Sequence, residues 1–355
     1  MWTSLTEIDF LRDLVAIPSV SGAEEDAAVM VEHAARQAGL DVVRDATSVR
    51  VIIGDAARGP TVVLASHLDV VPPGEGWTRD PFDPVIEGDL LYGRGSGDAK
   101  ASVSAMFWAI ADLAQAAPLA GRAMAVFSYG EETRFATMPQ AVELIGRIDA
   151  ALIGEPTNLQ AAVAQRGLMM VDLVAHGDQR HAGYASAGDF SNAITRLAGE
   201  IVKLDGIVGE RVHPVLGVTT VTPTMLDSGV SRNVTPPTAR AVLDIRSTPA
   251  WTHDQLEDAL RERLDCEVVV TSKRLVPCET PQQSRLLDAI RKAAPAVSTY
   301  GSPTCSDWCF LRHADAVKIG PGTSRRSHTP DESVNISEVT AARSLYARII
   351  EAYFS

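Results

Sequence analysis

Side chains that could bind a metal follow several strand-like runs of this chain. Each run is apolar, and a histidine, aspartate or glutamate stands at its carboxyl end or shortly after it. The candidate metal ligands are His67, Asp98, Glu132, Glu155 and His328. Because parallel-sheet proteins bind their ligands beyond the carboxyl ends of the strands, we expect these five side chains to converge. A mixed set of imidazole nitrogens and carboxylate oxygens suits two zinc-like ions better than one.

Such a pair of ions would support amide hydrolysis. This reaction needs a strong nucleophile at neutral pH and charge stabilisation on the carbonyl oxygen. Two divalent ions that share one carboxylate lower the pKa of a common water from about 15.7 toward about 7. The carboxylates of Asp98, Glu132 and Glu155, together with one hydroxide, would balance two dications. Charge balance matters because an uncompensated charge is expensive in a partly dry pocket.

Two adjacent glutamates, Glu131 and Glu132, follow an apolar run at 125–128. Neighbouring residues beyond a strand point in different directions, so both carboxylates cannot chelate one ion well. We therefore assign Glu132 to the metal and Glu131 to the general base that faces the reacting water. The alternative is a pair of solvated surface glutamates.

Asp69 stands two residues after His67, so the two side chains lie on one side of a strand or of its exit. Asp69 could therefore hold the second ring nitrogen of His67 and fix its tautomer. The alternative is a buried histidine that is paired with a carboxylate and binds no metal. Asp98 ends the glycine-rich turn 93–97, whose glycines allow the backbone to bend tightly beside an ion.

The segments that must position these residues alternate between helix and strand. Helices are expected at 5–16, 22–39 and 100–116, and strands at 41–53, 61–66, 123–128 and 150–153. Ser21 is the expected N-cap of the second helix, with Glu24 at the capping-box position. Short β-branched strands that alternate with helices predict an α/β layer with a mostly parallel sheet.

The pattern changes near residue 166. The following residues predict four strands and two helices, with strands at 166–177, 218–226, 239–247 and 266–272 and helices at 189–204 and 253–264. This order is typical of a compact α+β module. The first pattern then resumes, so we predict one catalytic domain made of 1–166 and 276–355, with an inserted domain at 167–275.

The bulk composition limits the classes of protein that remain. A chain of 355 residues exceeds the usual size of one core, which favours two domains. The net charge of −13 argues against nucleic acid or an anionic membrane as the main partner. The least polar stretch, 101–121, is interrupted by polar residues and predicts a buried helix rather than a membrane span. No secretory signal is evident, and the four cysteines form no paired framework, which fits a reducing cytoplasm.

Four segments of the chain, in this order and spacing, resemble those of the dinuclear zinc amidohydrolases: SHLDVVPPGEGW, LYGRGSGDAK, GEE and GEP. That family includes acetylornithine deacetylase, succinyl-diaminopimelate desuccinylase, aminoacylase and carboxypeptidase G. Several matched motifs in order are more specific than any one of them. One departure is the sequence AKAS at 99–102, where the family often has Met-Lys-Gly-Gly. We expect this change to alter helix packing rather than to remove the metal.

The resemblance implies a role for each residue of the predicted cluster. One zinc ion would be bound by His67 and Glu155, the other by Glu132 and His328, with Asp98 as the bridge. Glu131 would be the general base, and Asp69 would orient His67. Two zinc ions per subunit are implied, and cobalt could substitute for them.

The resemblance also implies that the inserted domain is a lid and the interface of a homodimer. The segment GDQRHAGYASAGDFSNAI at 177–194 is similar to the lid segment whose histidine reaches across the dimer to the reacting carbonyl. That histidine would be His181, with His176 as the competing candidate. A histidine donor beside a developing oxyanion is chemically reasonable.

Further residues are expected to contact the substrate. Asn233 would donate a hydrogen bond to it, and the forked guanidinium of Arg246 would bind a substrate carboxylate. The alternative for Arg246 is a surface ion pair. Loops similar to the family's substrate wall contain Ser306, Asp307, Gly320 and Gly322. The neighbouring Arg325 and Arg326 would either bind an anionic group or be solvated.

The expected function is metal-dependent hydrolysis of the amide bond of an N-acyl amino acid in the cytoplasm. The segments RGLMMVDL, GSPTCSD and IGPGTSRRSHTPDE look most like the acetylornithine deacetylase branch. N-acetyl-ornithine or N-succinyl-ornithine in arginine biosynthesis is therefore the favoured substrate. The alternatives are N-acetyl-lysine or succinyl-diaminopimelate in lysine biosynthesis, or a small dipeptide or carboxypeptidase substrate. A non-catalytic scaffold that binds metabolites is a remote alternative, because no expected ligand is missing.

Overall fold

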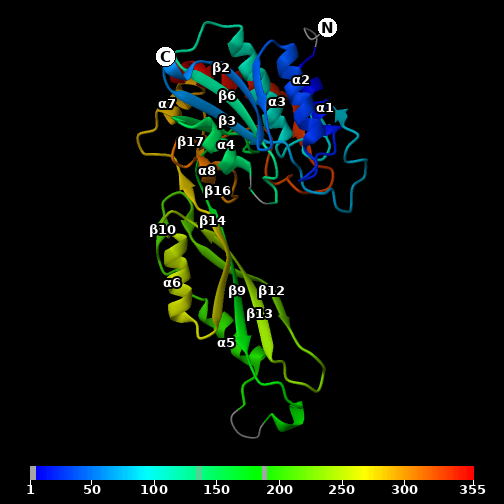
Figure 1. Cartoon of the computed structure of the whole chain (residues 1–355), viewed down its shortest axis with the longest axis vertical. Helices are drawn as coiled ribbons and strands as arrows, with labels where there is room; N and C mark the ends of the chain where they lie inside the picture. Colours follow the sequence, from blue (N-terminus) through cyan, green and yellow to red (C-terminus); the bar gives the residue numbers. More distant parts are fainter. Residues whose placement is uncertain (1–4, 134, 136, 186–189) are drawn as a thin grey trace. The chain divides into compact units, whose positions relative to one another are not determined.

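The computed structural model describes residues 5–133, 135, 137–185 and 190–355. Buried apolar strands form the centre of its largest sheet. The chain divides into two compact units (Figure 1). Unit 1 comprises residues 1–163, 280–300 and 306–355, and unit 2 comprises residues 164–279 and 301–305.

The sheet of unit 1 has four parallel strands at its centre. In order across the sheet they are β6 (Arg122–Ser128), β3 (Thr61–His67), β7 (Ala150–Ile153) and β17 (Asp315–Lys318). Antiparallel strands extend it, with β2 (Ser48–Gly54) and β1 (Asp41–Arg44) beyond β6, and β8 (Ala161–Gln165) beside β17. Every residue of β3 and β7 is buried, as expected for parallel strands covered on both faces. The predicted α/β class with a mostly parallel sheet is therefore confirmed.

Five helices supply apolar side chains to the core of unit 1: α1 (Glu7–Val15), α2 (Glu25–Gln37), α3 (Lys100–Ala114), α7 (Arg285–Ala293) and α9 (Ile336–Phe354). Phe10 of α1 stacks on Phe107 of α3, with ring centroids 4.7 Å apart. The shorter elements are η2 (Ala56–Arg58), β4 (Val85–Glu87), β5 (Leu90–Tyr92), α4 (Thr137–Ile145), β16 (Thr299–Ser302), α8 (Trp308–Leu311) and β18 (Ser333–Asn335). Of these, β18, β5 and β4 form a small antiparallel sheet.

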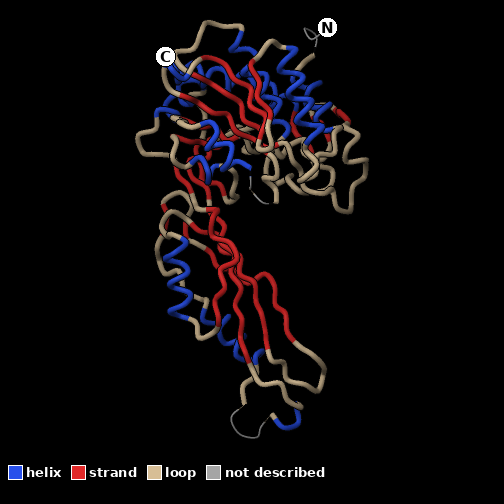
Figure 2. Tube along the Cα trace, in the orientation of Figure 1, coloured by secondary structure: helices blue, strands red, loops and turns tan. Residues whose placement is uncertain are grey.

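Unit 2 contains a four-stranded antiparallel sheet (Figure 2). Its order is β12 (Thr220–Ser228), β13 (Thr238–Ser247), β9 (Gly167–His176) and β14 (Glu267–Leu275). Alternate residues of β9 are buried against helices α5 (Ala193–Lys203) and α6 (His253–Arg263), so one face of the sheet forms a core. The shorter elements are η3 (Ala182–Tyr184), β10 (Val212–His213), β11 (Gly217–Val218) and β15 (Cys278–Glu279).

The two compact units divide the chain near the predicted domain boundaries but not at them. The changes occur after residues 163 and 279, whereas the sequence placed them after 166 and 275. Residues 301–305 join unit 2 because Gly301 packs closely against Val215 and Leu216. The backbone N–H of Arg166 also donates to the carbonyl of Ser302 at 3.1 Å.

Helix α2 begins three residues later than predicted. Glu24 is its N-cap residue and makes no capping hydrogen bond through its side chain. The Ser21 hydroxyl instead donates to Asp69 Oδ2 at 2.7 Å, and Glu24 Oε1 accepts the N–H groups of Gly22 and Gly130. The predicted capping box is therefore wrong, because both side chains are used to hold loops beyond β3 and β6.

The least polar stretch of the sequence lies mainly in α3. Most of this 15-residue helix is buried, as predicted for a core helix. Within the described part of the chain, no helix is long and apolar enough to cross a membrane.

Candidate metal centre

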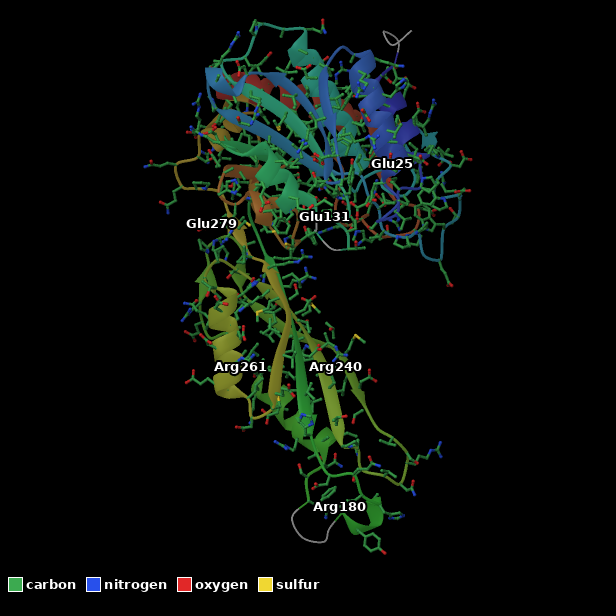
Figure 3. All side chains as sticks on the ribbon, viewed as in Figure 1. Glu25, Glu131, Arg180, Arg240, Arg261 and Glu279 are labelled. Atoms are coloured by element: carbon green, nitrogen blue, oxygen red, sulfur yellow. The ribbon has the colours of Figure 1, made fainter. Side chains whose placement is uncertain are left out.

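The carboxyl ends of β3, β6 and β7 lie at the same end of the sheet, although β7 ends two residues before β3 in the register. His67, the last residue of β3, is in register with Ser128, the last residue of β6. The chain continues beyond these strand ends to Asp69, Glu131 and Glu155. Figure 3 shows Glu131 at the edge of unit 1. The sheet therefore brings residues that are distant in sequence to one edge, as the strand pattern predicted.

The carboxylate of Asp98 lies between two histidines. Its Oδ1 is 3.4 Å from His67 Nε2, and its Oδ2 is 3.6 Å from His328 Nε2. Glu155 is 3.8 Å from His67 Nε2, and Glu132 is 3.0 Å from His328 Nε2. Donor atoms of His67, Asp98 and Glu132 all lie within 4.8 Å of one another. The predicted ligands thus form two groups that share Asp98, which is the arrangement of a bridging carboxylate.

The environment of His67 fits a metal ligand. Its ring is buried, and Nδ1 lies 3.0 Å from the main-chain carbonyl oxygen of Asp69, which can only accept a hydrogen bond. The Nδ1 atom therefore carries the hydrogen, and in the neutral ring Nε2 has a free lone pair. No hydrogen bond reaches the buried Nε2 atom. Donor atoms bound to one zinc at about 2.1 Å would lie about 3.4 Å apart, close to the His67–Asp98 separation.

The carboxylates of the centre repel one another when no cation is present. Burial, with the charge of Asp98, raises the pKa of Glu155 to about 8. Burial, with the charges of Glu155 and Asp307, also raises the pKa of Glu131 well above its ordinary value. Although burial opposes it, the neighbouring imidazoles of His67 and His328 lower the pKa of Asp98. Divalent cations would relieve this repulsion, so the donor set fits two of them.

Asp69 organises the loop that follows β6. Its Oδ1 accepts the backbone N–H of Glu131 and its Oδ2 that of Glu132, both at 3.0 Å. Although burial opposes it, hydrogen bonds from His67, Ser21 and the Glu132 N–H lower the pKa of Asp69. Asp69 Oδ1 also lies 3.4 Å from His67 Nδ1. Asp69 therefore contacts the histidine as predicted, and it also positions both glutamates, which the sequence did not indicate.

The other predicted ligand loop carries His328. Its ring is half exposed, and its backbone is left-handed with φ 63°, an uncommon conformation for a residue other than glycine. Glu132 is more buried, with a side chain that is 8% exposed. Asp307, expected in the substrate wall, is buried, and its Oδ2 accepts a hydrogen bond from the Ser128 hydroxyl at 2.7 Å. Burial raises the pKa of Asp307 to about 6.

Unit 2 brings His181 and Asn233 together. His181 forms an isolated bridge with Val234, and the Ala182 N–H donates to the Asn233 carbonyl at 2.8 Å. The Gly183 N–H donates to His181 Nδ1 at 3.1 Å, so in the neutral ring Nε2 carries the hydrogen. An Nε2–H group on an exposed ring is available as a donor. Residues 186–189 of the predicted lid segment lie outside the described residues.

The remaining predicted site residues differ in their surroundings. Arg246 forms a two-point ion pair with Asp244, at 2.7 and 3.0 Å. Ser306 is fully buried, and the Gly322 N–H donates to Glu338 at 2.7 Å. His176, the competing lid histidine, lies 3.3 Å from Glu267.

The two arginines beside the His328 loop also differ. The Arg326 guanidinium donates to the Ser333 hydroxyl at 3.2 Å, and this arginine is partly buried. Arg325 is exposed, and its backbone N–H lies 3.5 Å from the Thr323 hydroxyl. Arg326 thus has a structural partner at the start of β18.

Comparison with known proteins gives a consistent result. The family model described as peptidase family M20/M25/M40 matches residues 63–352. A succinyl-diaminopimelate desuccinylase of Methylorubrum extorquens is 30% identical, with 96% of this chain and 97% of that relative covered. The enzyme of the same name from Methylobacterium sp. (strain 4-46) is 30% identical over 100% of this chain and 98% of its own.

Solved structures share the fold. An M20 family metallo-carboxypeptidase from Sulfolobus solfataricus superposes with a TM-score of 0.81 at 18% identity, covering 98% of this chain and 99% of its own. The YXEP protein of Bacillus subtilis, a dinuclear metal binding peptidase from the M20 family, superposes with a TM-score of 0.74 at 17% identity, covering 97% and 96%.

Proposed function

This chain belongs to peptidase family M20/M25/M40, and from that premise we propose that it hydrolyses the amide bond of an N-acyl amino acid with two zinc ions as cofactors. The observation that carries the proposal is the Asp98 carboxylate, which turns one oxygen toward each of two histidines. Glu155 and Glu132 complete the two groups of donors. Histidine and carboxylate donors of this kind suit zinc.

The proposed substrate is N-succinyl-diaminopimelate or a close analogue whose acyl group ends in a carboxylate. The succinyl-diaminopimelate desuccinylases described above support this choice, since they match nearly the whole chain at about 30% identity. The sequence motifs favoured N-acetyl-ornithine or N-succinyl-ornithine and arginine biosynthesis. That preference is not supported, and the lysine-pathway alternative takes its place.

Two bound divalent ions would polarise the amide carbonyl and lower the pKa of a shared water. Glu131 would receive a proton from the attacking water on a carboxylate oxygen and deliver it to the amide nitrogen as the C–N bond breaks. The products are then a carboxylate and a protonated amine, which together account for both hydrogens of the water. Asp69 would keep Glu131 in place through the backbone N–H bond at 3.0 Å.

The lid residues of unit 2 have proposed roles in the same reaction. His181 would donate its Nε2–H to the carbonyl oxygen as negative charge develops there. Asn233, which adjoins His181, would donate to the substrate. To bind a substrate carboxylate, the Arg246 guanidinium would either contact Asp244 and the substrate together or release Asp244. As in the related family, we propose that a second copy of the chain supplies His181 across a homodimer.

The experiment is a substrate panel on protein that has been stripped with a chelator and reloaded with zinc or cobalt. The panel compares N-succinyl-diaminopimelate, N-succinyl-ornithine, N-acetyl-ornithine, N-acetyl-lysine and a dipeptide. We expect the highest kcat/KM for N-succinyl-diaminopimelate. A higher value for N-acetyl-ornithine would restore the arginine-pathway assignment, and hydrolysis without any added metal after complete stripping would refute the proposed chemistry.

A further inference from the structure

A buried glutamate that belongs to neither metal-ligand group lies directly behind Asp98. Glu332 is 1% exposed, and its carboxylate accepts three backbone N–H groups from the glycine-rich turn. Oε1 accepts from Gly97 at 2.9 Å and from Asp98 at 3.0 Å, while Oε2 accepts from Gly95 at 3.1 Å. One carboxylate therefore accepts backbone hydrogen bonds along the turn that leads to Asp98, the proposed bridging ligand.

The same carboxylate is paired with a buried arginine. Arg94 Nη1 donates to Glu332 Oε2 at 2.5 Å, and both side chains are 1% exposed. Arg94 Nη2 donates to the carbonyl of Pro73 at 3.2 Å, and the guanidinium lies 5.1 Å from the Trp77 ring centroid. Pro73 and Trp77 belong to the loop that follows His67 and Asp69 in the chain.

Glu332 also lies in the loop that carries His328, four residues further along the chain. Its carbonyl accepts the N–H of Gly93 at 2.9 Å, and the next residue, Ser333, pairs with Tyr92 in the small antiparallel sheet. The Arg94–Glu332 pair thus connects three segments that carry metal ligands or their neighbours: the loop after β3, the turn before α3 and the loop before β18.

Stability alone gives a weak reason for burying this ion pair. Burying two charges costs several kcal/mol per ion, and a buried ion pair is often no more stabilising than apolar side chains of similar volume. The Asp98 carboxylate, in contrast, must present two oxygens to two sites at once, and an error of about 1 Å in its backbone would misplace both. A carboxylate that accepts the Asp98 N–H itself sets the position of that backbone.

We propose that Glu332, with Arg94 as its charge partner, is a positioning residue for the metal pair. It holds Asp98 so that the two groups of donors form together. The inference rests on the metal-dependent function proposed above, but not on the identity of the substrate. Removing the interaction weakens binding of the second ion most, because only the second ion requires Asp98 to bridge.

The test compares metal binding by stripped wild-type protein with that of Glu332→Gln, using isothermal titration with zinc and the absorption spectrum of the cobalt form. A glutamine keeps the shape but offers one carbonyl oxygen and one NH₂ group, so either Gly97 and Asp98 or Gly95 and Arg94 lose their acceptor. We expect affinity for the second ion to fall about 10- to 100-fold, with a changed cobalt spectrum.

Asp331→Asn is the matched control. Asp331 lies in the same loop, and its carboxylate accepts hydrogen bonds from the Thr78 N–H and hydroxyl at 3.0 and 2.9 Å. This variant makes the same carboxylate-to-amide change and should bind both ions with unchanged affinity. Two ions bound by Glu332→Gln with wild-type affinity and spectrum would overturn the inference, even if the variant unfolds at a lower temperature.

Hydrogen exchange on the metal-free wild-type protein keeps the inference testable if Glu332→Gln does not fold. The amide hydrogens of Gly97 and Asp98 should exchange slowly without any metal, because Glu332 holds them in place. Rapid exchange of both amides would overturn the inference. A wild-type protein that binds no divalent metal would refute the proposed function itself, which distinguishes the two failures.

Discussion

Buried carboxylates in unit 1 have different roles because each has different hydrogen-bond donors around it. Asp69 accepts bonds from the Ser21 hydroxyl and from the N–H groups of Glu131 and Glu132, and its pKa is lowered although burial opposes the change. Burial and neighbouring carboxylates raise the pKa of Glu131 well above its ordinary value. Asp69 is thus suited to hold its neighbours as a permanent anion, whereas Glu131 is suited to receive and release a proton.

Replacing Glu131 by glutamine should therefore remove the proton carrier and leave the metal ligands intact. We expect kcat to fall about 10²- to 10⁴-fold, the usual contribution of a general base. Metal content should equal that of the wild-type protein by elemental analysis. Wild-type turnover would show that another group takes the proton, and loss of metal would show that Glu131 is a ligand.

His181 offers a second prediction at this scale. The ring is exposed and its Nδ1 accepts the Gly183 N–H, so His181→Ala should not disturb a core. Loss of an oxyanion donor typically costs about 10²- to 10³-fold in kcat, and we expect a loss of that size with unchanged metal stoichiometry. Equal kcat values for wild type and variant would remove His181 from the reaction. The corresponding His176→Ala variant serves as the control, since that ring faces Glu267.

At the scale of elements, the ends of strands and helices decide which side chains meet. The parallel strands β3, β6 and β7 end on the same side of the sheet, so short loops of a few residues are enough to bring their polar residues together. The start of α2 shows the opposite case. Ser21 has the right position for a helix cap, yet its hydroxyl bonds Asp69, since that carboxylate is brought next to it by the fold.

The start of α6 provides a pH-dependent element. His253 is buried, its Nε2 lies 2.8 Å from the Ser247 hydroxyl and its Nδ1 lies 2.7 Å from the Lys273 carbonyl. A carbonyl only accepts, so Nδ1 carries the hydrogen and the neutral ring satisfies both contacts. Burial lowers the pKa of His253, with the nearby charge of Lys273 acting in the same direction and Asp254 and the backbone bond opposing it.

The sign of the pH effect follows from this lowered pKa. Below about pH 6.5 the unfolded chain gains a proton on this histidine that the folded chain does not. The free energy of unfolding therefore decreases as the pH is lowered, until the pH reaches the lower pKa of the folded state. The free energy of unfolding of wild type minus that of His253→Gln should therefore shrink between pH 7.5 and 5. Denaturant titrations at several pH values measure it. A difference that stays constant or grows on acidification would contradict the neutral-ring assignment.

At the scale of the whole molecule, residues proposed to take part in the reaction occur in both compact units. The candidate metal centre lies in unit 1, and the candidate lid residues His181, Asn233 and Arg246 lie in unit 2. The sheet of unit 2 ends at β12, an edge strand that is exposed along almost its whole length. Met225 and Leu226 on this edge are 59% and 65% exposed. Exposed apolar edge strands tend to pair with another chain, which supports the proposed homodimer.

Sedimentation should therefore show a dimer that a charge on this edge weakens. Leu226→Asp places an unpaired carboxylate on β12 and should weaken association at least about tenfold, as for a central interface residue. Val202→Asp on α5 is the matched control, because Val202 is also apolar and is 75% exposed, on a helix that packs against β9 and β13. A wild-type monomer, or equal effects of the two substitutions, would argue against pairing through β12.

The sequence alone indicated the fold class, which the structure confirms, and the candidate metal ligands, which the structure brings close together. Both depend on local patterns: continuous apolar runs specify buried parallel strands, and the residue types at their ends specify the donor chemistry. The helix starts were less predictable. Ser21 has the local signature of a helix cap, but its hydroxyl instead donates to Asp69, which lies 48 positions away in the sequence.

Only the tertiary structure decided how these residues are combined. The division of donors into two groups around Asp98 depends on contacts between chain segments that are up to 230 positions apart. The Glu332 carboxylate bonds the backbone of Gly95, Gly97 and Asp98 across a separation of 234 to 237 positions, and no local pattern marks that glutamate. Short-range preferences act between neighbours in the chain, whereas the position of Asp98 is set by packing and hydrogen bonds that exist only once the chain has folded.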